Sequence, residues 1–418
     1  MKRKRSSAKF GDQALQPKFL ADYFTGVASK GLSGAEVDKY RSNQHEFNGV
    51  KILKDLLGTA DHKFATKFMY FDDGSSIPLI IDSSVTWYDA RKQQQERSAE
   101  YRLYYTVDSS PVMDCAAEGD LLVVARQPDD SLLIIIADCG STAADQICNL
   151  FGIKDQAQDF IVLPKGTLER QSLGYMHELI LEQLGVQVVG RNDELGERAY
   201  RKFGGKFPPT RQFSEYARRF VSDVSVQDNP DTALLDWVRQ EERLFRALEW
   251  KIVSEQLKSG FGDRGDSVDQ FVKLSLSVIN RRKSRAGLAL EHHLEEVFKK
   301  FGMRFARGKK TENNSKPDFI FPSIEDYNSQ TMDPERVFML GVKSSCKDRW
   351  RQILAEAKKI QKKHLFTLEP GISSNQIEEM SINSVQLVVP QELHSFYPPA
   401  HRRSLLSLEG FISLVMRR

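Results

Sequence analysis

Cysteine is scarce in this sequence, and long hydrophobic runs are missing. The four cysteines, Cys115, Cys139, Cys148 and Cys346, form no CxxC or His-paired spacing, which predicts reduced thiols and excludes a sequence-encoded zinc motif. The longest apolar run, Ser131–Ala137, is far shorter than the roughly 18 residues that a membrane span needs. The basic start MKRKR has no apolar segment behind it, so a secretory signal is not expected. These absences predict a cytoplasmic protein with no membrane partner.

Neither sign of charge is in large excess, since 60 Lys and Arg stand against 57 Asp and Glu. The basic residues are, however, unevenly distributed along the chain. Residues 281–310 carry ten basic and three acidic side chains, a net charge of +7. Residues 343–363 carry eight basic and two acidic side chains, a net charge of +6. Two basic blocks in one half of a nearly neutral chain favour a polyanionic partner. Two solvated helix faces are the alternative.

The hydrophobic pattern divides the chain into two regions. In the first, short apolar segments separated by turn residues predict a β-barrel or sandwich; they lie at 67–71, 77–81, 101–107, 120–125 and 131–137. A helical pattern at 168–184 and a polar, glycine-bearing linker at 190–209 follow. In the second region, segments of helical and strand character alternate, which predicts an α/β domain. The expected helices are at 213–224, 234–258, 268–276, 287–301, 347–363 and 402–416. The expected strands are at 317–321, 337–342, 364–367 and 385–390. The expected domains are 1–160, a connector at 161–205, and 206–418.

Four residues of the second region, three acids and a lysine, are candidates for a catalytic site. Asp318 opens one apolar strand and Lys343 ends another; Glu356 follows 13 residues later, and Glu291 lies upstream on a helix. Adjacent strand ends can bring an aspartate and a lysine together, and converging carboxylates make an oxygen-rich site for Mg²⁺. Such a site suits phosphodiester hydrolysis. A strand-capping aspartate beside a surface lysine is the plain alternative.

The helix expected after Lys343 begins with Lys347, Asp348 and Arg349. Lysine and arginine match the O6 and N7 atoms of guanine, and aspartate matches the N4 amine of cytosine. Helical spacing would place Arg349 and Glu356 on one face, which would couple base reading to cleavage. A charged helix start with ordinary ion pairs is the competing interpretation.

The segments SVINRRKSRAG (277–287), KPDFIFPS (316–323) and KSSCKDRWRQIL (343–354), with Glu356, closely resemble the EcoRII-type restriction endonucleases. HLFTL (364–368) and LVVP (387–390) continue the resemblance, which covers about residue 207 to the C-terminus. It implies a PD-(D/E)xK nuclease fold, Mg²⁺ dependence, and sequence-specific cleavage of double-stranded DNA by a homodimer. A cognate DNA methyltransferase is the functional partner that it implies. Gly341 departs from the wider superfamily, which has an acidic residue there; in this branch Glu356 is thought to replace it.

The resemblance also implies roles for individual residues. Asp318, Lys343 and Glu356 would form the cleavage centre, assisted by Glu291, and the segment 347–349 would read outer CC/GG pairs of a short pseudopalindrome. Arg239 resembles an arginine that holds flipped central bases, although a helix-surface arginine is equally compatible with the pattern. Contacts to the DNA backbone are expected from Arg281, Arg282, Lys283, Arg285 and Tyr327.

The first region resembles the family only in layout. Segments around 24–26, 48–49, WYDAR (87–91) and ERSAEYRLYY (96–105) follow the arrangement of a B3-like pseudobarrel that binds a second, effector copy of the DNA site. The candidate DNA contacts there are Arg91, Arg97, Glu100 and Arg102. An ordinary β-strand edge would show a similar mixture of charges and aromatic residues.

Two other functions fit the same residues. One is a nuclease of DNA repair or recombination that recognises DNA structure instead of sequence. The other is a DNA-binding protein that has lost catalysis, against which the presence of Asp318, Lys343 and Glu356 argues. The type II restriction endonuclease is the function that the sequence favours.

Overall fold

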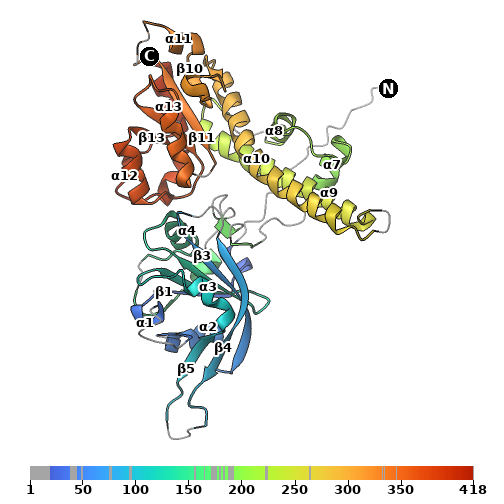
Figure 1. Cartoon of the computed structure of the whole chain (residues 1–418), viewed down its shortest axis with the longest axis vertical. Coiled ribbons are helices and arrows are strands. Elements are labelled where there is room, and N and C mark those ends of the chain that lie inside the picture. Colours follow the sequence, from blue (N-terminus) through green and yellow to red (C-terminus); the bar gives the residue numbers. More distant parts are fainter. Residues whose placement is uncertain are drawn as a thin grey trace, which may run out of the picture. The chain divides into compact units, whose positions relative to one another are not determined.

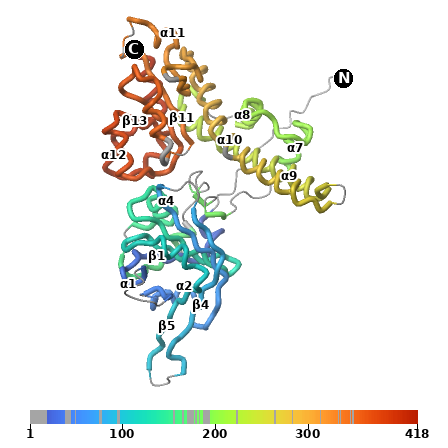
Figure 2. Tube along the Cα trace, viewed as in Figure 1, coloured from blue at the N-terminus to red at the C-terminus, as the bar shows by residue number. Residues whose placement is uncertain are grey.

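The computed structural model of the chain describes residues 19–417, apart from 38–44, 49, 75–77, 94–96, 155–156, 164, 171–176, 178–179, 182–183, 187–192, 222–224, 263–264, 332, 334 and 345. The chain forms two compact units (Figures 1 and 2). The first lies within Met1–Tyr70, Leu79–Ile136 and Leu150–Ile180, and the second within Phe71–Pro78, Ala137–Asn149 and Leu181–Arg418. Among the described residues, no helix is long and apolar enough to cross a membrane. The domain boundaries expected at residues 160 and 206 stay a prediction.

The first unit is built on an eight-stranded sheet in the order β2-β5-β4-β3-β7-β6-β1-β8. Its strands are β1 (Gly26–Gly31), β2 (Glu46–Phe47), β3 (His62–Phe71), β4 (Leu79–Asp89), β5 (Tyr101–Tyr105), β6 (Leu121–Arg126), β7 (Leu132–Ala137) and β8 (Ile161–Val162). The β3–β4 and β4–β5 pairs are antiparallel, as are β1–β6, β1–β8 and β2–β5. The prediction of mainly β structure is confirmed, whereas the B3-like pseudobarrel stays a prediction.

Alternating apolar residues explain this sheet. Phe64, Thr66 and Phe68 on β3, and Val85 and Trp87 on β4, are buried at every second position, as expected when one face of a strand covers a core. The Trp87 indole N–H donates to the Gly58 carbonyl at 2.9 Å.

The short helical segments of the first unit are η1 (Leu20–Asp22), α1 (Gly34–Val37), η2 (Val50–Leu53), α2 (Lys54–Leu57), η3 (Val107–Ser109), α3 (Ser110–Met113) and α5 (Lys165–Arg170). Helix α4 (Thr142–Phe151) contains residues of both units.

The second unit contains a five-stranded mixed sheet in the order β13-β12-β11-β10-β9. Its strands are β9 (Ala306–Arg307), β10 (Phe319–Phe321), β11 (Phe338–Lys343), β12 (Lys363–Thr367) and β13 (Val385–Val388). The β11–β12 and β12–β13 pairs are parallel, and β9–β10 and β10–β11 are antiparallel. Strand β10 and the part of β11 before Lys343 are continuously apolar and buried, as in sheets covered on both faces. The α/β prediction for this half is confirmed.

Two long helices dominate this unit (Figure 1). Helix α9 (Pro230–Ser259) starts where the Asn229 side chain accepts the Thr232 N–H, and α10 (Val268–Lys300) starts where Ser267 accepts from Gln270. Both starts have the N-cap chemistry that satisfies free backbone donors. The helices run side by side as a hairpin. The C-terminal half of α10 packs on the sheet, because Phe298 contacts Phe319 at a ring-centroid distance of 5.2 Å.

Several predicted boundaries differ from the structure. The two helices expected at 268–276 and 287–301 are one continuous helix, and the expected linker at 190–209 contains helix α7, whose Ala199 is buried. The helix expected at 347–363 is a short 3₁₀ helix, η5 (Lys347–Ala355). The remaining elements are α7 (Asp193–Lys202), α8 (Thr210–Arg218), η4 (Glu312–Asn314), α11 (Ile324–Asn328), α12 (Ser374–Ile382), η6 (Gln391–Phe396), η7 (Arg402–Ser404) and α13 (Leu408–Met416).

Asp231, in the first turn of α9, connects the long helices to the C-terminal segment. Its carboxylate accepts the backbone N–H groups of Gln391, Leu408 and Glu409 at 3.0, 2.9 and 2.9 Å, and its side chain is buried. Asp231→Ala would leave these donors buried without a partner. We expect it to lower the free energy of unfolding by about 2–4 kcal/mol, measured by urea denaturation of the full chain.

The matched control is Glu325→Ala, which removes an exposed acidic residue from the first turn of α11. It should change the free energy of unfolding by less than about 0.5 kcal/mol. Equal midpoints for the two variants would contradict the anchoring role of Asp231.

Candidate active site

Strands β10 and β11 place an aspartate beside a lysine. Asp318 comes directly before β10, Lys343 ends β11, and Phe319 pairs with Leu340 in antiparallel register. The Asp318 Oδ2 atom accepts the Val342 backbone N–H at 2.7 Å and lies 3.4 Å from Lys343 Nζ. The structure therefore brings the two predicted residues together, and the backbone hydrogen bond orients the carboxylate.

The structure gives a steric reason for the glycine two positions before Lys343. A Cβ atom on Gly341 would lie 2.7 Å from the Cγ2 atom of Ile353. Ile353 is fully buried in η5, so its side chain could not move away without repacking. A carboxylate therefore cannot project from position 341, and the second acidic group has to come from another element.

Glu356 supplies an acidic group from the turn after η5. It is the C-terminal cap of η5 and has an extended backbone (φ −87°, ψ 148°). Its Oε2 atom is buried and has no hydrogen-bond partner among the described residues. Burial raises the pKa of Glu356 to about 7; the Lys343 ammonium opposes this rise in pKa, and the Asp318 carboxylate adds to it. Glu356 therefore lies within electrostatic reach of both residues.

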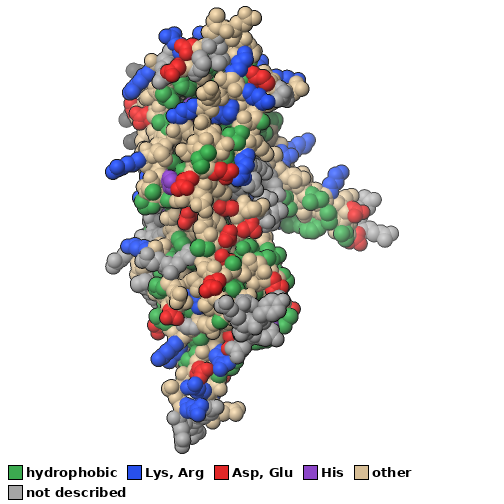
Figure 3. Space-filling view, turned by 60° about the vertical axis from the view of Figure 1, so that its left-hand side comes forward, with side chains coloured by type: hydrophobic (Ala, Val, Ile, Leu, Met, Phe, Trp, Pro, Cys, Tyr) green, Lys and Arg blue, Asp and Glu red, His purple; other side chains and the backbone are tan. Residues whose placement is uncertain are grey.

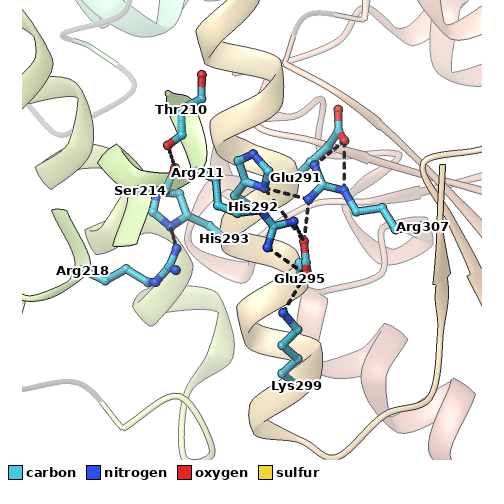
Figure 4. A network of polar contacts seen from close by, with 10 residues as sticks. All are labelled: Thr210, Arg211, Ser214, Arg218, Glu291, His292, His293, Glu295, Lys299 and Arg307. Atoms are coloured by element: carbon cyan, nitrogen blue, oxygen red, sulfur yellow. Dashed lines mark hydrogen bonds and ion pairs between the residues drawn. The ribbon is translucent and has the colours of Figure 1, made fainter. Parts of the chain in front are cut away.

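Glu291 lies on α10, and Arg307 of β9 forms an ion pair with its carboxylate (Figure 4). Arg307 Nη2 lies 2.7 Å from Glu291 Oε2, and Arg307 Nη1 lies 2.5 Å from Glu295 Oε2. Burial raises the pKa of Glu291, while the Arg307 hydrogen bond and charge oppose the rise. The Asp318 carboxylate also raises this pKa and Lys343 lowers it, so Glu291 faces the same centre.

The same network reaches helix α8, as Figure 4 shows. Arg211 of α8 lies 2.9 Å from Glu295, and Arg218 Nη1 lies 3.2 Å from His293 Nδ1. A network of side-chain hydrogen bonds and ion pairs restricts the relative positions of the elements that it joins. The network therefore fixes α10, and with it Glu291, between α8 and the sheet.

The donor set fits a small, hard divalent cation. No group of three or more His, Cys, Asp or Glu side chains in the described part of the chain is arranged to hold a metal ion. Magnesium, however, often takes only one or two protein carboxylates and keeps several waters. The unpartnered Oε2 atom of Glu356, near Asp318, is a suitable oxygen ligand. The candidate magnesium residues are thus Asp318 and Glu356.

The predicted base-reading segment opens η5, but the side chains of Lys347, Asp348 and Arg349 lie outside the described residues. The backbone of this segment is anchored: the Cys346 N–H donates to Glu369 Oε2 at 2.8 Å, and Trp350 is fully buried. The expectation that Arg349 and Glu356 share one helix face is wrong, because η5 is a 3₁₀ helix that ends at Ala355. Its buried residues recur at a spacing of three, which suits 3₁₀ geometry.

Several residues expected to contact DNA form ion pairs inside the hairpin. Arg285 is buried against Glu241 and Glu242, and Arg282 pairs with Glu249. The Arg281 guanidinium lies 4.8 Å from the Phe207 ring centroid. The Lys283 side chain is outside the described residues. The burial of Arg285 is a correction: its charge is neutralised by glutamates of α9, which the local sequence count could not include.

The other predicted residues lie in separate places. Tyr327 is fully buried and donates to Glu312 at 2.5 Å, and burial raises its pKa. Arg239 lies on α9, partly exposed. In the first unit, Arg91 and Arg102 both pair with Glu100, while Arg97 is exposed. Their contacts with DNA stay predictions.

Three residues of this site carry no distinctive sequence signal. Arg307 holds Glu291, Glu369 holds the Cys346 backbone, and Lys363 contacts the turn that carries Glu356. In the sequence, Arg307 and Lys363 stand out only as members of the two basic blocks. A pattern of basic residues does not reveal which lysine or arginine is buried.

The second unit contains the segment that matches a known protein family. Residues 245–412 match the family model described as EcoRII C terminal. The type II restriction enzyme EcoRII of Escherichia coli is 46% identical over 209 residues, which are 50% of this chain and 50% of that protein. The chain thus spans about half the length of this relative. The resemblance of this chain to the EcoRII-type enzymes is confirmed.

Two solved structures are similar at lower identity. Metal-depleted Ecl18kI in complex with uncleaved DNA has 16% identity and a TM-score of 0.43, covering 54% of this chain and 83% of that chain. The complex of restriction endonuclease PspGI with substrate DNA has 18% identity and a TM-score of 0.42, covering 51% of this chain and 95% of that chain.

The raised pKa of Glu356 predicts a stability change with pH. Between the ordinary pKa of 4.5 and about 7, the folded protein binds a proton that the unfolded chain releases, so the free energy of unfolding falls as pH rises through this window. Glu356→Gln removes this loss. In EDTA at pH 8, we expect the variant to be about 1–3 kcal/mol more stable than the parent chain, measured by urea denaturation.

At pH 4.5 the two proteins should differ by less than at pH 8, because the parent carboxyl is then protonated. Glu325→Gln, at an exposed position on α11, is the control and should follow the parent at both values. A constant difference between Glu356→Gln and the parent across this range would contradict the burial of an ionisable Glu356.

Proposed function

We propose that this chain is a type II restriction endonuclease that makes Mg²⁺-dependent double-strand cuts at a short DNA pseudopalindrome with outer CC/GG pairs. The observation that carries the proposal is the meeting of Asp318, Lys343 and Glu356 inside residues 245–412, the segment that matches the EcoRII C-terminal family model. A cognate DNA methyltransferase would protect the same site in the host. A second, effector copy of the site, bound by the first unit, would regulate cleavage.

The side chains have distinct tasks in this proposal. Magnesium bound by Asp318 and Glu356 would supply positive charge and a more acidic water. The Lys343 ammonium, 3.4 Å from Asp318, donates a hydrogen bond to the attacking water or neutralises charge on the phosphate oxygen. Glu291 adds negative charge to the centre, and Arg307 keeps its carboxylate in place.

Sequence recognition would depend on the segment 347–349, whose backbone the buried Glu369 anchors through Cys346. A rigid backbone is required because a bidentate contact to a base edge tolerates little displacement. Arg239 would contact flipped central bases. Phosphate contacts from Arg281, Arg282 and Lys283 would make binding strongly salt-dependent.

Cleavage of both strands would use a homodimer, since one chain supplies one centre. The outer face of α10 supports this part of the proposal: Val268, Val272, Leu276 and Ile279 are exposed at helical spacing, and hydrophobic side chains gather on the projecting hairpin (Figure 3). Two copies of α10 packed antiparallel about Leu276 would bring the two apolar stripes together across a two-fold axis.

A nuclease specific for DNA structure is the alternative function for the same centre. It would cut branched or damaged DNA regardless of sequence, and Lys347→Ala would leave its activity largely intact. A DNA-binding protein without catalysis would bind but leave DNA uncut.

Digestion of a sequenced plasmid with several CC(N)GG sites tests the function. We expect discrete ends at a subset of these sites in Mg²⁺ and none in EDTA. Lys343→Ala should lower the cleavage rate at least about 100-fold, because charge stabilisation by such a group is worth about 3–4 kcal/mol. The ends are mapped by sequencing, and initial rates are measured on gels.

Lys362→Ala, an exposed lysine of the same basic block, is the control and should keep the parent rate. Short duplexes with CC(N)GG sites, added in trans, supply any effector copy that the plasmid lacks. Intact DNA under these conditions, with specific binding in gel shifts, would count against a nuclease.

Leu276→Glu tests the dimer surface. The side chain is 55% exposed in the single chain, so the substitution should not disturb folding, but it would place two buried carboxylates at the centre of the dimer. We expect the dimer dissociation constant to rise at least about 100-fold, measured by analytical ultracentrifugation, with nicking replacing double-strand cutting.

Ser277→Glu adds the same charge at the next exposed position, on the opposite side of α10. It should leave the dissociation constant within about threefold of the parent. If both variants keep the parent mass distribution, the dimer forms through another surface.

A further inference from the structure

One lysine of the second basic block is buried, while its neighbours face solvent. Lys363, the first residue of β12, is 6% exposed, whereas Lys358, Lys359 and Lys362 are exposed. A buried ammonium is rare unless its donors are satisfied. Lys363 Nζ donates to the backbone carbonyl of Glu356, and to those of Ala357 and Ile360 at 3.1 and 3.2 Å. Its three donors thus have three backbone acceptors.

These acceptors belong to the turn that presents Glu356. The chain leaves η5 at Glu356 with an extended backbone, and Ala357 then has φ +43°. That left-handed conformation is uncommon for a residue with a Cβ and costs about 1 kcal/mol or more. The Ile360 N–H also donates to the Ala357 carbonyl at 2.9 Å. The turn is strained at Ala357 and is held from inside by the Lys363 ammonium.

The Lys363 backbone is fixed independently of this contact. Its N–H donates to the Ser384 carbonyl at 3.0 Å, and it pairs with Val385 in the parallel register of β12 and β13. The ammonium is therefore attached to the sheet that also carries Asp318 and Lys343. A contact from this sheet to the Glu356 turn fixes the distance between the two acidic residues.

We infer that Lys363 is a positioning residue that holds the Glu356 turn in place and so sets the position of the Glu356 carboxylate relative to Asp318. The inference rests on the proposed function in one respect, the role of Glu356 as a magnesium ligand. Lys363 touches neither the metal nor the DNA in this arrangement. It acts through the backbone carbonyls of the turn, and its positive charge also lies within electrostatic reach of the Glu356 carboxylate.

The experiment compares Lys363→Met with Lys362→Met in the full chain. Methionine has a similar length and no donor, so the first variant removes the carbonyl contacts, and the second removes an exposed lysine at the neighbouring position. Amide hydrogen exchange of residues 355–360 is measured without metal. The concentration of Mg²⁺ that gives half of the maximal rise in melting temperature is measured without DNA.

For Lys363→Met we expect exchange of the turn amides to be at least about 10-fold faster and the magnesium midpoint at least about 10-fold higher, each equivalent to about 1.4 kcal/mol. Binding of the cognate duplex without metal should stay within about threefold of the parent. Lys362→Met should match the parent in all three measurements. Unchanged exchange would overturn the inference, and so would faster exchange with an unchanged magnesium midpoint.

Two further measurements keep the outcome decisive. If Lys363→Met does not fold, Lys363→Arg takes its place, because a planar guanidinium keeps the charge but does not reproduce three contacts from one nitrogen; a magnesium midpoint equal to that of the parent would then overturn the inference. If magnesium does not raise the melting temperature of the parent itself, the proposed metal site fails. Lys363 is then judged by the exchange of the turn amides alone.

Discussion

The antiparallel pairing of β10 with β11 is the constraint on which the candidate site depends. Its register puts Asp318 opposite the end of β11, where the Val342 N–H orients the carboxylate toward Lys343. A shift of one residue would turn one of these side chains to the other face of the sheet. The parallel pairing of β11 with β12 then places Lys363 under the Glu356 turn. One sheet thus aligns the catalytic candidates and the residue that supports them.

The long helix α10 connects this sheet to the rest of the second unit. Its C-terminal half packs on the sheet through Phe298 and carries Glu291, whereas its N-terminal half forms the hairpin with α9 and exposes an apolar stripe. One helix therefore joins the candidate active site to the surface proposed for a second copy. In a nuclease that cuts two strands, such a link would fix the separation of the two centres.

Several arginines of the basic blocks form ion pairs inside this unit, which their distribution along the sequence does not indicate. Arg282 and Arg285 pair with glutamates of α9, and Arg307 pairs with Glu291 and Glu295. A count over residues 281–310 leaves out the partners of Arg282 and Arg285, because Glu249, Glu241 and Glu242 lie on α9, outside that window. The basic blocks therefore contain both residues that could bind DNA and residues that hold the fold together.

The sequence by itself determined the α/β class of the second unit, the mainly-β class of the first, the resemblance to EcoRII-type enzymes, and the choice of Asp318, Lys343 and Glu356 as candidates. Period-two and helical patterns, strand-end positions and the near-identity of short segments carry that information. Only the tertiary structure decided that η5 is a short 3₁₀ helix, that Arg285 is buried, and that Arg307 and Lys363 hold the acidic residues. Those facts depend on which distant residues meet in space, and neither periodicity nor composition records such meetings.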